Sequence, residues 1–444
     1  MINKLIDAVE KNRQLILDAH DYIWKNPETG YREWKTTKYL EDAFENLGYE
    51  IMRAGDIPGF YTDIDTGRPG PQVLILGELD ALLCAEHKEA DSETGAAHSC
   101  GHHAQSAALL GIAAALSEPG TLDVMCGKIK LCAVPAEELI EIKYRTELKN
   151  QGKIKYFGGK SEFLYRGYFD GVDIAFMVHT GGKLSVRDGS VGCLAKSIEY
   201  KGVSAHAGGS PWEGCNALYA ANMGLAGINS IRETFKEKDL IRVHPIITQG
   251  GAAVNAIPDL VKIESYIRGA SFEAMKEAND KVNRALSGGA LSLGAHIEIN
   301  DAPGYSPLIN DKNMIELACE AAKYAYPDME CVYNKVMGTG STDMGDLSTI
   351  MPVVHPYAPG AVGKSHGTDY KVTNPELACV SCAKWQVVML YMLLCDGAKL
   401  AEKVIEEFEP KFSSKDEFLN YVDGLNSCGE RITYNEDGSA YIKI

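Results

Sequence analysis

The sequence predicts an α/β protein with a mostly parallel central sheet flanked by helices, interrupted by a second, inserted module. Short apolar runs of strand length alternate with helical stretches in the first part of the chain: VLILG at 73, KLCAV at 130 and DIAFMV at 173. Such alternation is typical of a parallel sheet. After about residue 187 the order of predicted strands and helices changes. A chain of 444 residues also exceeds the size at which one hydrophobic core keeps growing, which favours two domains.

The predicted helices and strands of the N-terminal part indicate where functional residues should lie. Residues 2 to 48 predict two amphipathic helices separated by the turn-forming sequence NPETG at 26. After the first strand, the stretch HAQSAALLGIAAALSE from 103 predicts a helix. In parallel sheets the chemistry gathers beyond the carboxyl ends of the strands. Residues that directly follow the apolar runs are therefore the first candidates for a site.

Residues 187–302 predict a compact inserted module. The order is strand AKSIEY, a helix from Asn216 to about Phe235, strands VHPIIT and VKIESYIRG, helix FEAMKEANDKVNRAL and strand AHIEIN. This is a βαββαβ, ferredoxin-like unit. We therefore assign residues 1–186 and 303–444 to two parts of a first α/β domain, the second carrying a C-terminal extension. A long helix is expected from about residue 374 to 409, and a terminal hairpin around the turn NEDG at 435.

Charge and composition exclude several classes of protein. A formal charge of -17 argues against nucleic-acid binding, because a polyanion needs a basic face. The first residues predict an amphipathic helix, neither a signal peptide nor an anchor, and no uninterrupted apolar run is long enough to cross a bilayer. We expect a cytoplasmic protein that binds no membrane and keeps its twelve cysteines as reduced thiols.

The densest candidate cluster is the hexapeptide HSCGHH at 98, where a loop enters the helix that begins near Ala104. Cysteine thiolate and imidazole are standard ligands for zinc and similar divalent ions. A buried cysteine beside a hydrogen-bonded histidine is also common in proteins without a metal. The hexapeptide alone leaves both explanations open.

Two adjacent carboxylates, Glu137 and Glu138, follow the strand KLCAV. Neighbouring carboxylates raise each other's pKa unless a cation compensates, and a metal ion would supply that cation. One carboxylate can then bind metal while the other moves protons. His179 follows the strand DIAFMV, and His366 lies in the loop GKSHGT. Together with HSCGHH these residues fit a pair of metal ions with one shared ligand.

Nine motifs in this order resemble a known family, the metal-dependent exopeptidases that include aminoacylases, glutamate carboxypeptidases and auxin-conjugate amidohydrolases. The likeness is greatest to the aminobenzoyl-glutamate hydrolase branch. It extends over nearly the whole chain, through NPETGYRE at 26, GELDAL at 77, HSCGHH at 98, PAEE at 135, GGKSEFLYRGYFDGVD at 158, SAHAGGSPWEGCNAL at 204, NAIPD at 255, STDMGDLS at 341 and SHGT at 365.

The resemblance implies two divalent metal ions per subunit, zinc or manganese. It also implies a role for each matching residue: Cys100 as the ligand shared by both ions, His102 and His179 for one ion, Glu138 and His366 for the other, Glu137 as general base, Asp80 as a carboxylate that orients the site, Asn255 beside the substrate carboxylate, and His206 as the donor that polarises the scissile carbonyl. His206 lies in the inserted module, which the resemblance implies is a lid and the contact of a homodimer. His206 would then act from the partner subunit.

The segment LIEIKYRTELKNQGKIKYF, residues 139–157, departs from the family pattern of two glycines after the paired glutamates. It starts next to the expected general base, so we expect it to reshape the substrate pocket. Its basic residues Lys143, Arg145, Lys149 and Lys153 predict a solvated face, or alternatively a surface that attracts an acidic substrate. Elsewhere, His355 predicts a hydrogen-bonded histidine at a strand end.

The function predicted is a metal-dependent amidohydrolase. A metal-activated water would cleave an amide bond in a small N-acyl amino acid, an aminobenzoyl-glutamate-like conjugate or a dipeptide. A hydrolytic deaminase would use the same site and is one alternative. The second alternative is a non-catalytic or partner-dependent subunit of a two-subunit hydrolase, against which the intact Glu137 and ligand set count.

Overall fold

The computed structural model describes all 444 residues and divides the chain into two compact units of mixed α/β content. Unit 1 comprises Met1–Gly189, Leu308–Gly338 and Thr342–Lys415. Unit 2 comprises Ser190–Pro307, Thr339–Ser341 and Asp416–Ile444. Along the sequence, Ser190–Pro307 of unit 2 thus lies between two parts of unit 1.

Unit 1 is built on a six-stranded sheet in the order β1-β2-β6-β3-β7-β16. The strands are β1 (Met52–Arg53), β2 (Phe60–Asp65), β3 (Gln72–Glu78), β6 (Lys128–Val134), β7 (Ile174–Phe176) and β16 (Val353–Val354). Strands β6, β3, β7 and β16 are parallel, whereas β2 and β1 run antiparallel. The mostly parallel sheet is therefore present, and the carboxyl ends of its four parallel strands point the same way.

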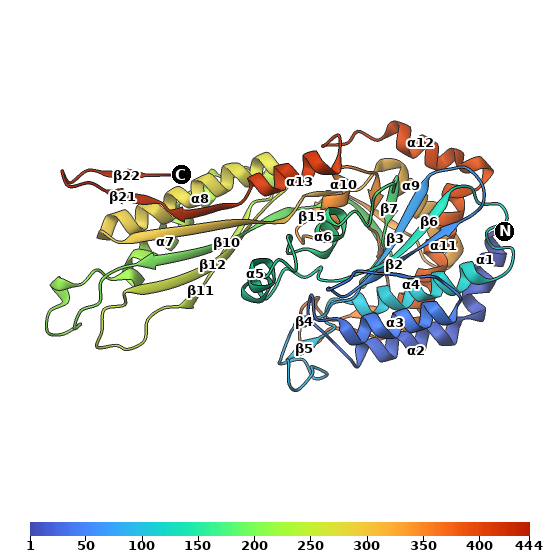
Figure 1. Cartoon of the computed structure of the whole chain (residues 1–444), viewed down its shortest axis with the longest axis horizontal. Helices are drawn as coiled ribbons and strands as arrows, with labels where there is room; N and C mark the ends of the chain where they lie inside the picture. The colour runs from blue at the N-terminus through green and yellow to red at the C-terminus, as the bar shows by residue number, and fades with distance from the viewer. The chain divides into compact units, whose positions relative to one another are not determined.

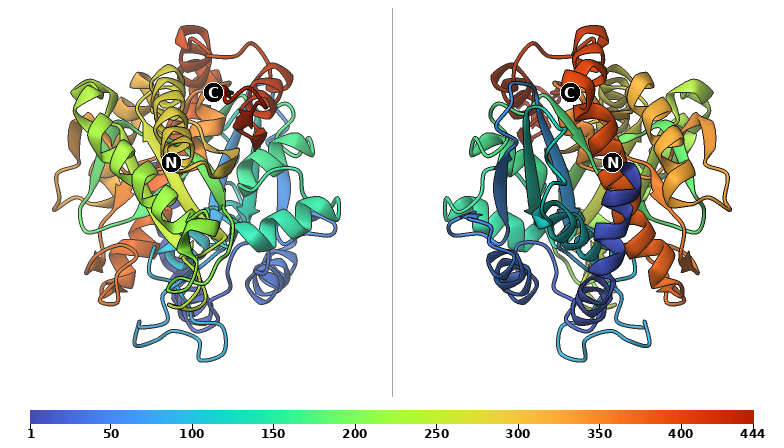
Figure 2. Two further views of the ribbon diagram at one scale, coloured as in Figure 1. Left: turned by 90° about the vertical axis from the view of Figure 1, so that its left-hand side faces the viewer. Right: turned by 90° about the vertical axis from the view of Figure 1, so that its right-hand side faces the viewer.

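Ten α-helices belong to unit 1, and several of them pack on this sheet or on one another. They are α1 (Ile2–Lys11), α2 (Arg13–Trp24), α3 (Trp34–Asn46), α4 (His102–Ser117), α5 (Ile142–Asn150), α6 (Gly159–Tyr165), α9 (Lys312–Ala325), α10 (Met344–Ser348), α11 (Cys382–Leu394) and α12 (Lys399–Glu407). Helix α4 packs on β3 and α2 packs on α4, while α1 lies against α11 from the far end of the chain (Figures 1 and 2). Three helices form where two were predicted, because the chain breaks at Asn12.

The helical segment Glu376–Leu394 is long and apolar enough to cross a membrane, with a mean hydropathy of 1.7. It contains Glu376 and Lys384, so it is not an uninterrupted apolar run. Moreover, 78% of the segment is buried inside the protein, as in the core helix of a globular fold. The long helix expected to continue to residue 409 instead breaks after α11, where Asp396, Gly397 and Ala398 all have positive φ.

Unit 2 has the element order β10 (Gly192–Lys201), α7 (Ala217–Ile231), β11 (Arg242–Gln249), β12 (Leu260–Gly269), α8 (Phe272–Leu293) and β13 (His296–Tyr305). This is the βαββαβ order read from the sequence. Its antiparallel sheet has the order β11-β12-β10-β13-β20, and α7 and α8 pack on each other and against β10 and β12. Asn216 caps α7, because its side chain accepts from the amides of Leu218 and Tyr219.

Residues 416–444 belong to unit 2, whereas the sequence grouped residues 303–444 with the first domain. Helix α13 (Lys415–Gly424) leads into β20 (Ser427–Glu430), which pairs antiparallel with β13. Without β20, strand β13 would present a row of unpaired backbone groups at the sheet edge. The hairpin of β21 (Ile432–Tyr434) and β22 (Ala440–Ile442) forms as expected.

Candidate active site

The predicted site residues of unit 1 come from loops at the carboxyl ends of the parallel strands. Asp80 follows β3, and Glu137 and Glu138 follow β6. His179 begins β8 (His179–Thr180), after β7. Three of the four parallel strands therefore deliver polar side chains to one edge of the sheet.

Two further loops complete the set. Cys100 lies just before α4, and His102 is the first residue of that helix. Between them Gly101 has φ 104°, and a Cβ there would lie 2.3 Å from the Tyr370 hydroxyl oxygen, so this tight turn requires glycine. His366 lies between β18 (Ala361–Val362) and β19 (Lys371–Val372), and its backbone amide donates to the carbonyl oxygen of Ser99 at 2.8 Å.

The structure brings the five residues expected as metal ligands into two groups that share one member. The first group is Cys100, His102 and His179, and the second is Cys100, Glu138 and His366. Within each group the candidate ligand atoms all lie within 4.8 Å of one another. Thiolate, imidazole and carboxylate form a donor set that suits zinc and similar ions. The arrangement fits two ions with Cys100 between them.

Asp80 holds the His102 ring and the backbone of Glu138. The Nδ1 atom of His102 lies 2.9 Å from the Asp80 carbonyl oxygen and 3.1 Å from Asp80 Oδ1, so Nδ1 carries the proton. The other carboxylate oxygen of Asp80 accepts from the amide of Glu138 at 2.8 Å. His102 Nε2 is buried without a hydrogen bond, and it lies 3.2 Å from Glu78 Oε2. With Nδ1 held by Asp80, Nε2 is the ring atom left to bind a metal ion in this donor set.

His179 is held in the same way. Its Nδ1 lies 2.8 Å from the carbonyl oxygen of Thr180, while Nε2 lies 3.5 Å from Cys100 Sγ. Burial and the Glu138 charge act to raise the pKa of Cys100, but His102 and His179 outweigh them and lower the pKa to about 6. A thiolate is therefore accessible near neutral pH, as a metal ligand requires.

The pKa values of the two adjacent glutamates are shifted in opposite directions. Burial, together with Glu78 and Glu138, raises the pKa of Glu137. Burial also acts to raise the pKa of Glu138, but the hydrogen bond and charge of His366 outweigh it and lower the pKa to about 2. Titratable neighbours with separated pKa values identify proton-transfer and charge-stabilising roles. The Glu137 carboxyl group therefore holds a proton more readily than that of Glu138.

A buried ion-pair network beside Glu137 was not assigned from the sequence. The Lys160 ammonium donates to Glu78 Oε1 at 2.6 Å and to the Asp343 carboxylate. The three side chains are fully buried. Burial raises the pKa of Asp343 to about 7, with Lys160 opposing the rise. Glu78, Glu137 and Asp343 also cluster closely, but Lys160 already supplies a cation there. All three network residues lie in motifs quoted above, which was the available signal.

His206 and Asn255 lie in unit 2. Their segments meet, because the amide of Ala207 donates to the Asn255 carbonyl oxygen at 3.0 Å. His206 is exposed, and its Nδ1 accepts from the amides of Gly208 at 3.1 Å and Gly209 at 2.8 Å. The ring proton of neutral His206 is therefore on Nε2, which makes that atom a hydrogen-bond donor.

Two expectations for basic residues need correction. Arg145 is fully buried, so the predicted solvated face holds only for Lys143, Lys149 and Lys153. His355 was expected to be hydrogen-bonded, but both of its ring nitrogens are buried without a hydrogen bond. Its ring stacks on Tyr357 at a centroid distance of 5.8 Å. Burial lowers the pKa of His355 to about 3, so the ring is neutral at neutral pH.

Comparison with known proteins assigns the family. Residues 74–388 match Peptidase family M20/M25/M40. Human Xaa-Arg dipeptidase is 26% identical over 423 residues, which cover 90% of each chain. One of the p-aminobenzoyl-glutamate hydrolase subunits of Escherichia coli K12 is 29% identical over 313 residues, 66% of this chain and 58% of that protein. A crystal structure of a dinuclear metal binding peptidase of the M20 family from Bacillus subtilis superposes with a TM-score of 0.64 at 20% identity, covering 87% of this chain and 99% of that one.

The chain therefore belongs to Peptidase family M20/M25/M40. The resemblance stated from the ordered motifs is confirmed, and so is the expectation of an enzyme that hydrolyses amide or peptide bonds.

Proposed function

We propose that the protein is a dinuclear-metal amidohydrolase, with Cys100, His102 and His179 holding one ion and Cys100, Glu138 and His366 holding the other. The observation that carries this proposal is the pair of candidate ligand groups that share Cys100. The orientation of the His102 ring supports it, because Asp80 holds Nδ1 and the buried Nε2 is the atom left to bind a metal ion.

When bound, the metal ions lower the pKa of a water molecule and polarise the scissile carbonyl. Glu137 acts as the general base: burial and the neighbouring carboxylates raise its pKa, which makes it a better proton acceptor than an exposed glutamate, and it returns the proton to the leaving amine. Asp80 holds the His102 ring and the Glu138 backbone in place. His206 Nε2–H donates to the carbonyl oxygen as negative charge develops, an effect typically of a few kcal/mol.

The proposed substrates are small amides with a free carboxylate: N-acyl amino acids, aminobenzoyl-glutamate-like conjugates or dipeptides. Relatives that share the family act on molecules of this class by name, among them an Xaa-Arg dipeptidase, a p-aminobenzoyl-glutamate hydrolase and an N-acetyl-L-cysteine deacetylase. Asn255 would bind the substrate carboxylate. The twelve free cysteines support a cytoplasmic location.

Unit 2 is proposed as the lid and the contact of a homodimer. Its edge strand β11 and helix α7 expose large apolar side chains, with Tyr219 60%, Met223 51% and Ile246 52% exposed. An exposed apolar surface beside an unpaired sheet edge is typical of an interface. A two-fold dimer would let His206 of one chain complete the site of the other.

Metal analysis combined with substrate profiling tests the proposal. Purified protein should contain about two divalent ions per chain, and chelation should abolish turnover of a panel of N-acyl amino acids, aminobenzoyl-glutamate and dipeptides. Zinc or manganese should restore it. Unchanged turnover after verified metal removal would contradict the proposal. Release of ammonia from aromatic amines would favour the deaminase alternative, and metal binding without any turnover would favour the non-catalytic subunit.

A further inference from the structure

We propose that Arg145, from the segment 139–157, is a positioning residue that holds the backbone on both sides of the general base Glu137. Its guanidinium donates to the carbonyl oxygens of Ala136 and Glu138, the residues on either side of Glu137. The Nη1 distance to Ala136 is 3.4 Å, and Nη1 also donates to the Phe157 carbonyl oxygen at 2.6 Å. The inference rests on the proposed function, because it assigns Arg145 the task of holding Glu137 in place.

The backbone around Glu137 needs such support. Ala136 has φ 59°, a left-handed conformation that is unfavourable for a residue with a Cβ. The Ala136 amide donates to Glu33 Oε1 at 2.8 Å, and its carbonyl oxygen also accepts from the Gly159 amide at 3.2 Å. Persistent strain requires surrounding contacts that over-determine the conformation. Arg145 supplies contacts on both sides of Glu137.

The rest of the fold makes room for this arginine. A Cβ added at Gly30 would lie 2.4 Å from Arg145 Nη2 and 3.0 Å from Ala136 Cα, so only glycine fits. Arg145 also lies 5.6 Å from the centroid of the Tyr31 ring, and the Tyr31 hydroxyl donates to the Tyr156 carbonyl oxygen at 3.0 Å. The turn that contains Gly30 and the segment 139–157 therefore enclose the guanidinium together.

Burial makes the contacts of Arg145 informative. The side chain is fully buried, and removing a guanidinium from water is costly unless its donors are satisfied. Its hydrogen bonds go to backbone carbonyl oxygens, and Nε has no hydrogen-bond partner. An arginine that served only to fill space could be replaced by an apolar side chain at less cost. The fork of the guanidinium instead matches two carbonyl groups separated by Glu137.

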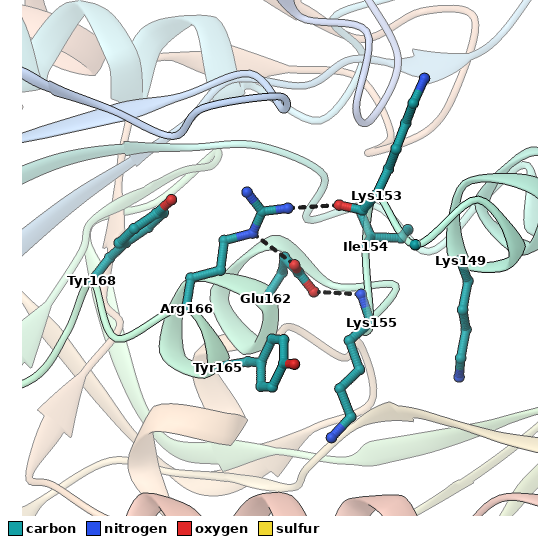
Figure 3. Close-up of a pocket in the computed structure, with 9 residues that line it drawn as sticks. Lys149, Lys153, Ile154, Lys155, Glu162, Tyr165, Arg166 and Tyr168 are labelled. Carbon is teal, nitrogen blue, oxygen red and sulfur yellow. Dashed lines mark hydrogen bonds and ion pairs between the residues drawn. The ribbon is translucent and has the colours of Figure 1, made fainter.

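The far end of the segment is anchored separately, which supplies a control. Figure 3 shows Glu162 accepting from the backbone amide of Lys155 at 2.8 Å and Arg166 donating to the Lys153 carbonyl oxygen at 2.6 Å. Arg166 Nε also donates to Glu162 at 2.8 Å. Arg166→Lys therefore loosens the same segment without touching the backbone around Glu137.

The experiment compares Arg145→Lys, Gly30→Ala and Arg166→Lys in the full-length, metal-loaded protein. Lysine lacks the fork, and alanine at Gly30 displaces it, so both changes should lower kcat about tenfold to a hundredfold, because misplacing a catalytic group by about 1 Å has an effect of this size. KM and the number of metal ions bound per chain should change less than threefold. Arg166→Lys should keep kcat within about twofold of wild type, as checked at equal folded fraction by thermal unfolding.

A second measurement is independent of turnover. In the cobalt-substituted protein, the visible absorption of the ions reports ligand geometry, and it should change in Arg145→Lys because the Glu138 carbonyl is released, but stay unchanged in Arg166→Lys. Equal effects of Arg145→Lys and Arg166→Lys on kcat and on the spectrum would overturn the positioning role of Arg145. Unchanged kcat and an unchanged spectrum in a folded Arg145→Lys variant would overturn it as well. If the wild-type protein turns over no amide, the proposed function fails. The cobalt spectrum alone then tests the positioning role of Arg145.

Discussion

The Nε2 atom of His366 lies 3.0 Å from a carboxylate oxygen of Glu138. The two residues come from separate loops, and His366 has φ 63°, an unfavourable conformation that is common at functional sites. His366 belongs to only one of the two candidate ligand groups. Its side chain should therefore affect only one of the two ions.

His366→Ala should lower the metal content from about two ions to about one per chain, because Cys100, His102 and His179 remain intact. Elemental analysis after dialysis against metal-free buffer measures this. His244→Ala, an exposed histidine of β11, is the control and should retain both ions. Retention of both ions by His366→Ala would rule out the ligand role.

Glu137→Gln should lower kcat by at least about a hundredfold, because an amide of the same shape cannot accept the proton of the attacking water. Its metal content should match wild type, since Glu137 belongs to neither of the two ligand groups that share Cys100. Initial rates with the best substrate of the panel provide the test. Near-normal turnover by the metal-loaded variant would exclude Glu137 as the general base.

Asp80→Asn should weaken metal binding about tenfold to a hundredfold, because the partners that orient a ligating histidine have effects of this size. The amide keeps the volume of Asp80 but removes one carboxylate oxygen that holds His102 or the Glu138 amide. Competition with a chelating dye measures the affinity. Asp65→Asn, on an exposed position of β2, should have no effect. An equal loss in both variants would argue against the orienting role.

Unit 2 should lose stability in acid through Asp301. Burial acts to raise the pKa of Asp301, but its ion pair with Lys196 outweighs this and holds the pKa below its ordinary value. A lowered folded-state pKa contributes stability that is present above the unfolded pKa of about 3.9 and is lost as the pH falls through the folded pKa. At Lys196, burial outweighs the same ion pair and lowers the pKa of the lysine. This shift changes the stability of unit 2 only at alkaline pH.

Asp301→Asn should therefore lower the free energy of unfolding by roughly 3–5 kcal/mol at pH 7, because it leaves Lys196 buried and unpaired. It should also flatten the loss of stability below about pH 4. Urea unfolding followed by circular dichroism at several pH values gives both quantities. Asp280→Asn, whose ion pair with Lys276 is exposed, should leave both nearly unchanged. An undiminished acid dependence in Asp301→Asn would assign the effect to other carboxylates.

The parts of the fold that follow from local pattern were predictable. VLILG, KLCAV and DIAFMV form β3, β6 and β7 because continuous apolar runs suit strands buried on both faces. The candidate ligands were predictable because residues directly after parallel strands meet at one sheet edge. Strand β20 was not, since Ser427–Glu430 shows no apolar alternation and forms only where β13 offers an edge.

Arg145 shows why charged residues are the hardest to place. On α5 its neighbours Lys143 and Lys149 are exposed, so the local sequence predicts solvent exposure for the whole group. Its partners are backbone carbonyl oxygens, which carry no signature in the sequence. Lys160 was hidden for a similar reason, because its carboxylate partners Glu78 and Asp343 lie far away along the chain.

Mixed dimers test whether His206 acts across the proposed interface. His206→Ala and Glu137→Gln should each be nearly inactive alone, because one lacks the donor to the carbonyl oxygen and the other lacks the base. If His206 completes the partner's site, a mixed dimer has one site with both residues changed and one with both intact. Random exchange at equal concentrations makes half of the dimers mixed, so about a quarter of wild-type activity should return. Subunit exchange is verified by mass spectrometry of differently tagged chains. Absence of recovery after verified exchange would mean that His206 acts within its own chain or takes no part in the reaction.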